Sequence, residues 1–410
     1  MEIDCTRDDA RANDPVGPAQ LPPGTRLLHI GPHKTGTTSV QGALFAAQDR
    51  LPAHGVEFPG YTRHPMEAAL AAVARPGMMG DAVPTERHWT TLVRQVREAG
   101  DRTAVVSSEF FADAEGDDTI ARIVEQLGGM GVPPLERSRE WGSVHVMVTL
   151  RPLVKVMPSQ WQQYVQNGLR MGYGDWLEHM LRKAPYEQPN PSFWRRHRHD
   201  RLVARWARAV GTERITVVVV DDRDRGGLMR TFEALLGLPA NLLQPVPDTA
   251  NRSLTLAETE MLRNLNREFR GNGLPDELYS RLVRNGAVMH MKNSCSPAPQ
   301  DVKISTPRWA AEAAAGIAAE MIDAITRTGV RVVGDPALLS TVPEPAGEPP
   351  QETRIAPEVA AQALYGALAA AAEVPVRHST PAKSRTVHQT SSVELVKVLG
   401  HRCLRRLRRH

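Results

Sequence analysis

Short apolar runs alternate with amphipathic stretches along the first two-thirds of the chain. Four runs have the length and the β-branched composition of buried strands: residues 26–30, 103–107, 144–150 and 215–220. Between them, apolar residues recur at helical spacing, most clearly over residues 39–45, 88–98, 119–127 and 193–210. Strands that alternate with helices build βαβ units with parallel strands. The pattern therefore predicts an α/β fold with a mostly parallel central sheet flanked by helices.

The pattern becomes mainly helical after residue 250. Its clearest helical pieces are residues 254–269, 307–328 and an Ala-rich stretch at 357–373. These pieces predict helical C-terminal additions to the α/β fold. We divide the chain into four parts: a flexible tail (1–24), one domain (25–340), a Pro/Glu-rich linker (341–356) and a helical extension with a basic amphipathic end (357–410).

Composition narrows the class of protein. The chain has 410 residues of which 41% are hydrophobic, enough for a sizeable core, and a net charge of only +4, so we expect no nucleic-acid partner. Its three cysteines lie far apart, which argues against a zinc or disulfide framework. The sequence has neither an apolar run of membrane-spanning length nor a secretory signal at residues 1–24. We therefore expect a cytoplasmic protein, of open oligomeric state.

Two runs of basic residues are interpreted first as solvated faces, because most charge runs are. They are residues 195–198 and 402–409. For the second run, the alternatives are peripheral contact with an anionic membrane surface or with a neighbouring subunit.

The loop after the first strand carries the most informative chemistry. It contains Lys34-Thr35-Gly36-Thr37-Thr38-Ser39 and joins a predicted strand directly to a predicted helix. Such a loop directs successive backbone N–H groups at one point, where the helix N-terminus adds partial positive charge. Lys34 adds a full charge and the threonines add hydroxyl donors. The segment therefore predicts a cradle for a phosphate or a similar oxyanion. It is not a Walker A motif, because Lys34 precedes Gly36 instead of following it.

This loop resembles the 5′-phosphosulfate loop of PAPS-dependent sulfotransferases, whose donor is 3′-phosphoadenosine 5′-phosphosulfate. Weaker matches to a bacterial, actinobacterial-type branch extend the resemblance over residues 26–340; they lie at 107–111, 158–163, 193–194, 251–254 and 329–335. The resemblance implies the P-loop-like sulfotransferase fold. It also implies sulfuryl transfer to a hydroxyl or amine of a small-molecule, carbohydrate or lipid acceptor, with PAPS as cosubstrate and no metal.

The resemblance also assigns residues that bind the donor. Residues 34–39 would hold the 5′-phosphosulfate, while Arg151 at a strand end and Ser159 eight residues later would hold the 3′-phosphate. Arginine offers phosphate a forked, permanently charged set of donors. The chain between the two must bend, and Pro158 is expected to restart the helix as a first-turn proline. A late basic loop could add a further contact through Asn251, Arg252 or Ser253, with Arg252 preferred.

The adenine position departs from the family pattern. Many members have an aromatic residue directly after Gly-Thr-Thr, and here that residue is Ser39. Adenine then needs another stacking platform, for which Trp161 is the candidate.

Lys34 is the expected stabiliser of charge on the leaving phosphate. Glu109, which follows a predicted strand and precedes Phe110 and Phe111, matches the general base of the heparan-type branch. Histidine is the base in another branch, for which the candidates here are His33, His64, His197 and His199. His33 lies inside the loop and could also bond the sulfonate. His64 and His197 are in addition candidates for contact with the acceptor.

Two other functions remain open from the sequence. A P-loop kinase of small molecules would need a magnesium ligand, for which Glu109 or Asp221 would serve. A non-catalytic nucleotide-binding scaffold is suggested by Ser39 and by the long tails. The acceptor itself would be bound by loops at 55–90 and 160–200, and the sequence of these loops does not identify it.

Overall fold

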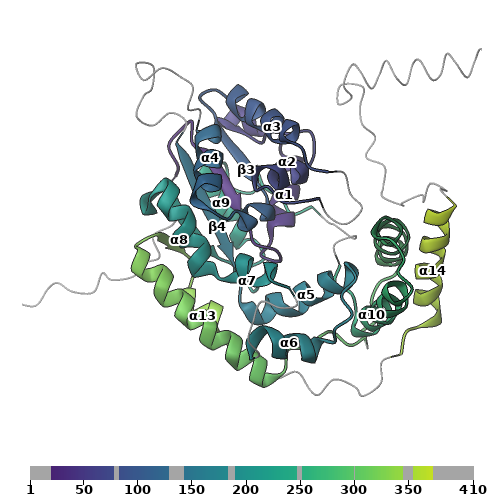
Figure 1. Ribbon diagram of the computed structural model, residues 1–410. Coiled ribbons are helices and arrows are strands. Elements are labelled where there is room, and N and C mark those ends of the chain that lie inside the picture. The colour runs from purple at the N-terminus through teal and green to yellow at the C-terminus, as the bar shows by residue number, and fades with distance from the viewer. Residues whose placement is uncertain are drawn as a thin grey trace, which may run out of the picture.

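The fold is seen in a computed structural model. It describes residues 20–77, 83–128, 143–182, 190–246, 252–299, 301–344 and 354–372 (Figure 1). The basic amphipathic end of the predicted helical extension lies outside the described residues, as do Asn251 and residues 1–19.

A six-stranded parallel sheet forms the centre of the molecule. Its strands, in spatial order, are β2 (Val56–Glu57), β3 (Thr103–Ser107), β1 (Arg26–Ile30), β4 (Val144–Leu150), β5 (Ile215–Val219) and β6 (Arg331–Val333). Each neighbouring pair is parallel. The four strands predicted from sequence are β1, β3, β4 and β5, and the predicted α/β fold class is confirmed. β1 lies between β3 and β4, which puts the loop that follows it at the middle of the sheet.

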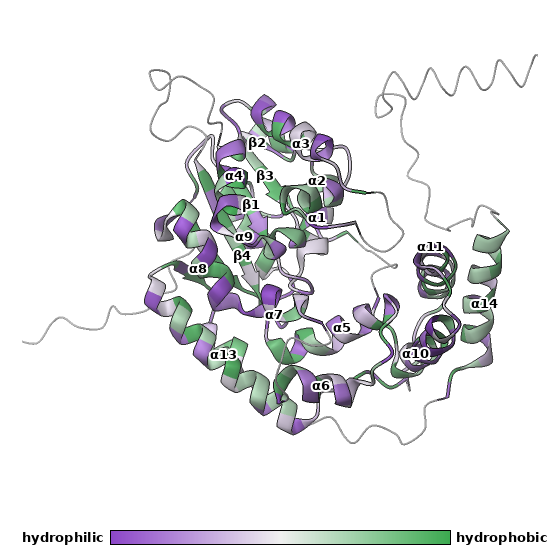
Figure 2. Ribbon diagram, viewed as in Figure 1, coloured by the Kyte–Doolittle hydropathy of each residue, from purple (hydrophilic) through white to green (hydrophobic). Residues whose placement is uncertain are grey.

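Both faces of the sheet are buried, because successive side chains of a strand point to opposite faces. In β1, Leu28 and Ile30 belong to one apolar core and Leu27 belongs to another. Neighbouring strands alternate in the same way, since Val146 and Val148 of β4 belong to the first of these cores and Met147 to the other. In Figure 2, much of the sheet is green, and the helices around it carry both green and purple residues. Continuous burial explains why these strands appear in the sequence as unbroken apolar runs.

Helices from two groups cover the two faces. α1 (Thr37–Ala46) and α9 (Gly227–Leu236) pack on the face that contains Leu27. The other face is covered by four helices: α2 (Met66–Ala72), α3 (Glu86–Glu98), α4 (Asp117–Leu127) and α8 (His199–Val210). Together they make the three-layer arrangement of a parallel α/β sheet.

The remaining helices form a second lobe with its own core. It comprises α5 (Leu153–Gln166), α6 (Tyr173–Leu181), α7 (Ser192–His197), α10 (Leu256–Gly271), α11 (Asp276–Leu278), a π-helical segment (Tyr279–Val288), α12 (Met289–Ser294), α13 (Arg308–Thr328) and α14 (Pro357–Ala371). Trp161, Trp176 and Tyr279 are fully buried in this core. α13 runs along both lobes, since Met321 belongs to the second core and Ile325 to the first. We call this second part the helical lobe.

Three details differ from the sequence predictions. The helix predicted over 193–210 is two helices, α7 and α8, because the backbone turns at Arg198, where ψ is 81°. Order begins before residue 25, since buried Leu21 donates its N–H to the Leu235 carbonyl. The helix expected to start at Pro158 instead starts at Leu153.

Pro158 thus lies inside α5, where it cannot donate to the carbonyl of Val154. The Thr306 hydroxyl donates to that carbonyl at 3.3 Å. A partner from a segment about 150 residues later in the chain therefore compensates for the missing hydrogen bond, which the local sequence could not indicate.

None of the helices that the structure describes is both long and apolar enough to cross a membrane.

Five histidines are buried in the two lobes and at their boundary. Burial lowers the pKa of His29 to about 3 and those of His145 and His199 to about 4. It also holds the pKa values of His33 and His197 well below 6.5, aided by nearby Arg196. All five are therefore neutral in the folded protein near pH 7.

We expect the free energy of unfolding to fall as pH drops from 6.5 to 5. In this window the unfolded chain takes up protons at these histidines and the folded chain does not, at about 1.4 kcal/mol per pH unit for each fully protonated site. Above pH 6.5 the effect disappears. Urea denaturation at pH 7.5, 6.0 and 5.0 measures it. His145→Gln keeps a partner for Thr216 and should reduce the dependence of the unfolding free energy on pH. An unfolding midpoint that does not change with pH would contradict the conclusion that the buried histidines are neutral.

Candidate active site

The loop between β1 and α1 lies at the carboxyl edge of the sheet. α1 begins at Thr37, and Gly36 before it has a φ of 98°, a left-handed conformation that glycine adopts without strain. The first N–H groups of a helix have no acceptor within the helix. They therefore open toward the space above the central strand, where parallel sheets collect ligands.

Lys34 also has a left-handed backbone, with φ of 73°. Only two other non-glycine residues in the described part of the chain have positive φ. The conformation costs a residue with a side chain about 1–2 kcal/mol. Two left-handed residues within three positions curve the chain into a concave nest of N–H groups. The strain is thus coupled to the shape that binds an anion.

A chain of buried side chains supports this loop from below. The Thr35 hydroxyl donates to the Pro32 carbonyl at 2.8 Å and contacts Thr149 Oγ1 at 2.9 Å. Thr149 on β4 lies 3.2 Å from His29 Nε2, and His29 Nδ1 lies 2.8 Å from Ser107 Oγ on β3. The polar chain therefore crosses three adjacent strands and ends in the loop.

Gly31 fixes the start of the loop. A Cβ at this position would lie 2.0 Å from Thr37 Oγ1, whose hydroxyl donates to the Gly31 carbonyl at 2.9 Å. Thr35 and Thr37 are buried and use their hydroxyl groups to shape the loop. Thr38 is half-buried and Ser39 is exposed, so these two hydroxyls lie nearer the opening.

Glu109 and His64 form a pair beside the loop. Glu109 begins a 3₁₀ turn (Glu109–Asp113) directly after β3, and its carboxylate is 3.2 Å from His64 Nε2. The same nitrogen lies 2.9 Å from Ser108 Oγ. Glu109 Oε2 is buried, and the side chain as a whole is 19% exposed. His64 therefore contacts the Glu109 carboxylate and the Ser108 hydroxyl together.

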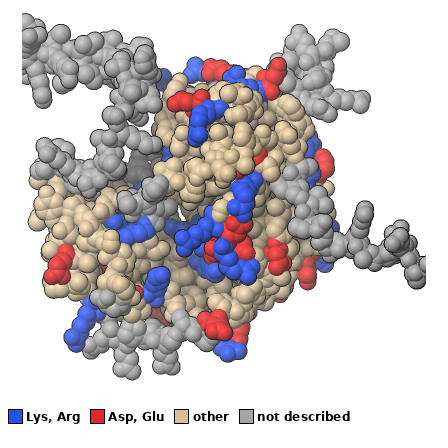
Figure 3. All heavy atoms as spheres, turned by 180° about the vertical axis from the view of Figure 1, so that it is seen from behind, with Lys and Arg blue, Asp and Glu red and all other residues tan. Residues whose placement is uncertain are grey.

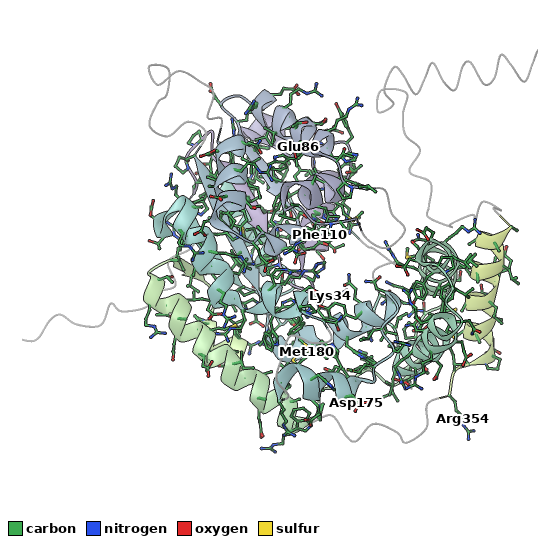
Figure 4. The ribbon with its side chains drawn as sticks, in the orientation of Figure 1. Lys34, Glu86, Phe110, Asp175, Met180 and Arg354 are labelled. Atoms are coloured by element: carbon green, nitrogen blue, oxygen red, sulfur yellow. The ribbon has the colours of Figure 1, made fainter. Side chains whose placement is uncertain are left out.

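Phe110 separates two histidine rings in the site. His33 meets it edge-on at 5.4 Å between centroids, and His64 stacks on it at 5.7 Å. Burial lowers the pKa of Lys34, while the negative charge of Glu109 acts in the opposite direction. Four of the predicted residues, Lys34, Glu109, His33 and His64, are thus brought together between the sheet and the helical lobe, where Figure 4 shows Lys34 and Phe110.

Arg151 follows β4 and reaches the same loop. Its Nη1 donates to the Lys34 carbonyl at 3.3 Å, and its Nη2 lies 2.7 Å from Asp222 Oδ1. Lys155 Nζ holds the other Asp222 oxygen at 2.8 Å. Burial alone would raise the pKa of Asp222, but Arg151 and Lys155 hold it below its usual value. Ser159 is half-buried on α5.

Two cavities flank this side of the loop. The larger, of about 480 Å³, lies between the ends of β5 and β6 and the start of α9, and Leu228 in its wall lies against Gly36. The smaller, of about 210 Å³, shares Asp221 and Arg223 with it and is bordered by Lys155 and Asp222. The larger cavity thus adjoins the loop through Leu228, and the smaller adjoins the ion pair of Arg151 through Asp222. Figure 3 shows a hollow with basic side chains along its edge on the rear face.

Other predicted residues lie away from the loop. The expectation that Trp161 stacks on adenine is wrong, because its ring is fully buried against Tyr173 and its Nε1–H donates to the Met171 carbonyl. Arg252 is held by both carboxylate oxygens of Glu258, at 2.7 and 2.9 Å, in the capping of α10. It therefore takes part in the packing of the helical lobe.

His197 is also placed in a core. Its ring is fully buried, 4.8 Å from that of Phe193, and neither ring nitrogen has a hydrogen-bond partner among the described residues. His199, next to it, is equally buried. Neither ring is exposed, so neither histidine can contact an acceptor in this structure.

The prediction of a solvated face fails for residues 195–198. Arg195 and Arg196 are largely buried and both bind the carboxylate of Asp113, which ends the turn that begins at Glu109. Asp113 and Asp222 were not predicted to be site residues. Only the three-dimensional pairing reveals them, because each lies more than 60 positions away from the arginine it holds.

No group of three or more metal-ligating side chains occurs in the described ranges.

Comparison with known proteins finds no family model that matches and no match among curated proteins. Among solved structures, the chain resembles the crystal structure of a sulfotransferase from Alicyclobacillus acidocaldarius. The alignment has 18% sequence identity and a TM-score of 0.36, and it covers 60% of this chain and 92% of that one. A likeness this distant does not establish an activity for this chain.

We expect Lys34→Gly to be about 1 kcal/mol more stable than Lys34→Ala, because only glycine adopts the left-handed backbone without strain. Urea denaturation of the two variants measures the difference. Arg50, which is exposed and has φ of −98°, is the matched control, and there the alanine variant should be the more stable one. Equal stability of the two Lys34 variants would show that the loop relaxes without its lysine.

Proposed function

We propose that the protein transfers a sulfuryl group from PAPS to a hydroxyl or amine of a small-molecule, carbohydrate or lipid acceptor. The observation that carries the proposal is that three groups meet at one loop: a lysine, a carboxylate paired with a histidine as the candidate base, and an arginine. Lys34 lies in the anion-binding loop, the Glu109–His64 pair lies beside it, and Arg151 donates to its backbone. These are the groups that sulfuryl transfer between a nucleotide and a hydroxyl requires.

In the proposed reaction, the acceptor oxygen attacks sulfur while the bond from sulfur to the bridging phosphate oxygen breaks. The electron pair of that bond goes to the leaving adenosine 3′,5′-bisphosphate. Lys34 and the N-terminus of α1 stabilise the charge that develops on the leaving phosphate. The rigid loop contributes by being shaped before the donor arrives, so little reorganisation is needed during the reaction.

Glu109 is the proposed base, which takes the proton of the acceptor hydroxyl. His64 and Ser108 are the positioning residues, since His64 contacts both the Glu109 carboxylate and the Ser108 hydroxyl. The stacking of His64 on Phe110 fixes the plane of its ring. The alternative is a histidine base, for which His64 has the required access and His33 faces the same ring of Phe110.

We place the 3′-phosphate of the donor at Arg151, with Ser159 on the neighbouring helix. In the structure, Arg151 is paired with Asp222, which is 29% exposed. A phosphate would replace Asp222 on Arg151, and an ion pair of this exposure is weak enough for that exchange. The adenine ring would then occupy the cavity beside Leu228 instead of a stacking platform in the helical lobe.

Calorimetric titration with adenosine 3′,5′-bisphosphate, 5′-AMP and ATP in metal-free buffer tests the donor assignment. We expect the bisphosphate to bind most tightly. Asp222→Asn should strengthen its binding about 2–5-fold, because the competing carboxylate is removed. Arg151→Ala should abolish the preference over 5′-AMP.

Asp117→Asn is the control, because Asp117 is in an exposed ion pair with Arg208 and its replacement should leave all three nucleotide affinities unchanged. Equal affinities for the three nucleotides in the unaltered protein would refute the proposed function.

Glu109→Gln should reduce turnover about 10²–10⁴-fold with donor affinity nearly unchanged, because the amide keeps the shape of the carboxylate and loses its basicity. Release of adenosine 3′,5′-bisphosphate from PAPS, followed against a set of hydroxylated acceptors, measures turnover. His64→Gln should reduce turnover less than Glu109→Gln does, as expected of a positioning residue. If Glu109→Gln turns over normally, the base is a histidine.

A further inference from the structure

A third cavity opens on the other side of the loop residue His33. It has a volume of about 350 Å³, within the range of ~300–1,000 Å³ typical of small-molecule sites. His33 and Phe110 form part of its wall, and Tyr164, Asn167 and Ser192 contribute polar groups from the helical lobe. We call it the His33 cavity. Phe110 in its wall also stacks on His64, the partner of Glu109, so an acceptor in this cavity would lie near the proposed base.

Three arginines line the His33 cavity. Arg195 and Arg196 belong to α7, and Arg75 follows α2. One carboxylate lines it with them, that of Asp113, which leaves an excess of two positive charges in the wall. Glu115, outside the wall and more than half exposed, contacts Arg75 and Arg195 and reduces the excess to one.

The two arginines of α7 are held rigidly. Asp113 Oδ1 accepts from Arg195 Nε at 3.0 Å and from Arg196 Nε at 2.8 Å, and its Oδ2 accepts from Arg196 Nη2 at 2.6 Å. The Asp113 side chain is 2% exposed. Burial alone would raise the pKa of this carboxyl, but Arg196 and Arg195 hold it below its usual value. Asp113 therefore stays ionised and fixes both guanidinium groups by their Nε edges.

Two residues that line the cavity each contain a buried polar atom without a hydrogen-bond partner among the described residues. The two atoms are Gln160 Oε1 and His33 Nε2. A buried polar atom without a hydrogen bond is costly. Gln160 Oε1 can only accept, so it requires a donor such as a hydroxyl group.

We propose that the His33 cavity binds a small hydroxylated acceptor that carries a negatively charged group. The carboxylate, phosphate or sulfate of the acceptor lies against Arg195, Arg196 and Arg75, and its hydroxyl groups reach Gln160 and His33. Guanidinium groups bind such oxyanions through two parallel N–H donors. The inference rests on the proposed function for what happens to the bound hydroxyl, but the binding of the anion stands independently of it.

The test uses pairs of probes in which one member carries an anionic group and the other is a related neutral molecule: D-glucuronate and D-glucose, glycerol 3-phosphate and glycerol, 4-hydroxybenzoate and 4-hydroxybenzamide. Each is titrated into the full chain with and without saturating adenosine 3′,5′-bisphosphate, which would occupy the loop and leave only the cavity for the anion. We expect the charged member of at least one pair to bind about tenfold or more tightly than its neutral partner.

Arg195→Gln should abolish this preference, and Arg195→Lys, which keeps the charge, should retain most of it. In Arg195→Gln, Asp113 still has Arg196 as a partner, which protects the fold. Arg208→Gln is the control, since Arg208 is exposed, pairs with Asp117 and is not part of the cavity wall. The unfolding midpoints of all three variants show that they are folded.

The outcomes separate this inference from the proposed function. Tight binding of the bisphosphate with no charge preference in any pair overturns the inference and leaves the donor site standing. A charge preference that Arg195→Gln abolishes, without any binding of the bisphosphate, supports the anionic pocket and overturns the sulfotransferase proposal. A preference that survives in Arg195→Gln places the anion elsewhere and also overturns the inference.

Discussion

The close approach of Thr37 to Gly31 is the contact on which the rest of the site depends. It forces the chain to turn from the central strand into α1 within six residues, and it leaves no room for a side chain at Gly31. The turn places Lys34 in a left-handed conformation. The chain from Thr35 through Thr149 and His29 to Ser107 supports it from three strands. The shape of the proposed anion site is therefore a consequence of the way the sheet is built.

The ion pairs of Asp113 connect the sheet to α7 of the helical lobe. The Glu109–Asp113 turn begins with the proposed base and ends with the carboxylate that holds α7. A shift of α7 would therefore act on Glu109 through five residues of one rigid turn. Burial makes this link strong, because removal of one partner from a buried pair typically costs about 3–5 kcal/mol.

Features formed by residues close together in the chain could be predicted from the sequence. Contacts between residues far apart in the chain could not. The strands stood out because both faces of the sheet are buried, so that each strand is a continuous apolar run. The Lys34 loop could be recognised because its glycine, lysine and hydroxyls lie within six positions. Asp113 and Asp222 carried no local signal, since their partners are far away in the chain. Trp161 was misplaced for the same reason: nothing near it in sequence shows that the helical lobe surrounds it.

The two arginine sites differ in a way that fits two different tasks. Asp222 is partly exposed, and exposed ion pairs contribute only about 0–1 kcal/mol, so a nucleotide phosphate can take its place on Arg151. Asp113 is buried between two guanidinium groups, and no ligand can displace it without leaving a carboxylate unpaired in the interior. An anion that enters the His33 cavity must therefore bind the guanidinium edges that Asp113 leaves open. In the proposed function, the first site would exchange its counterion for the donor phosphate, and the second would keep its arginines in place while an acceptor binds.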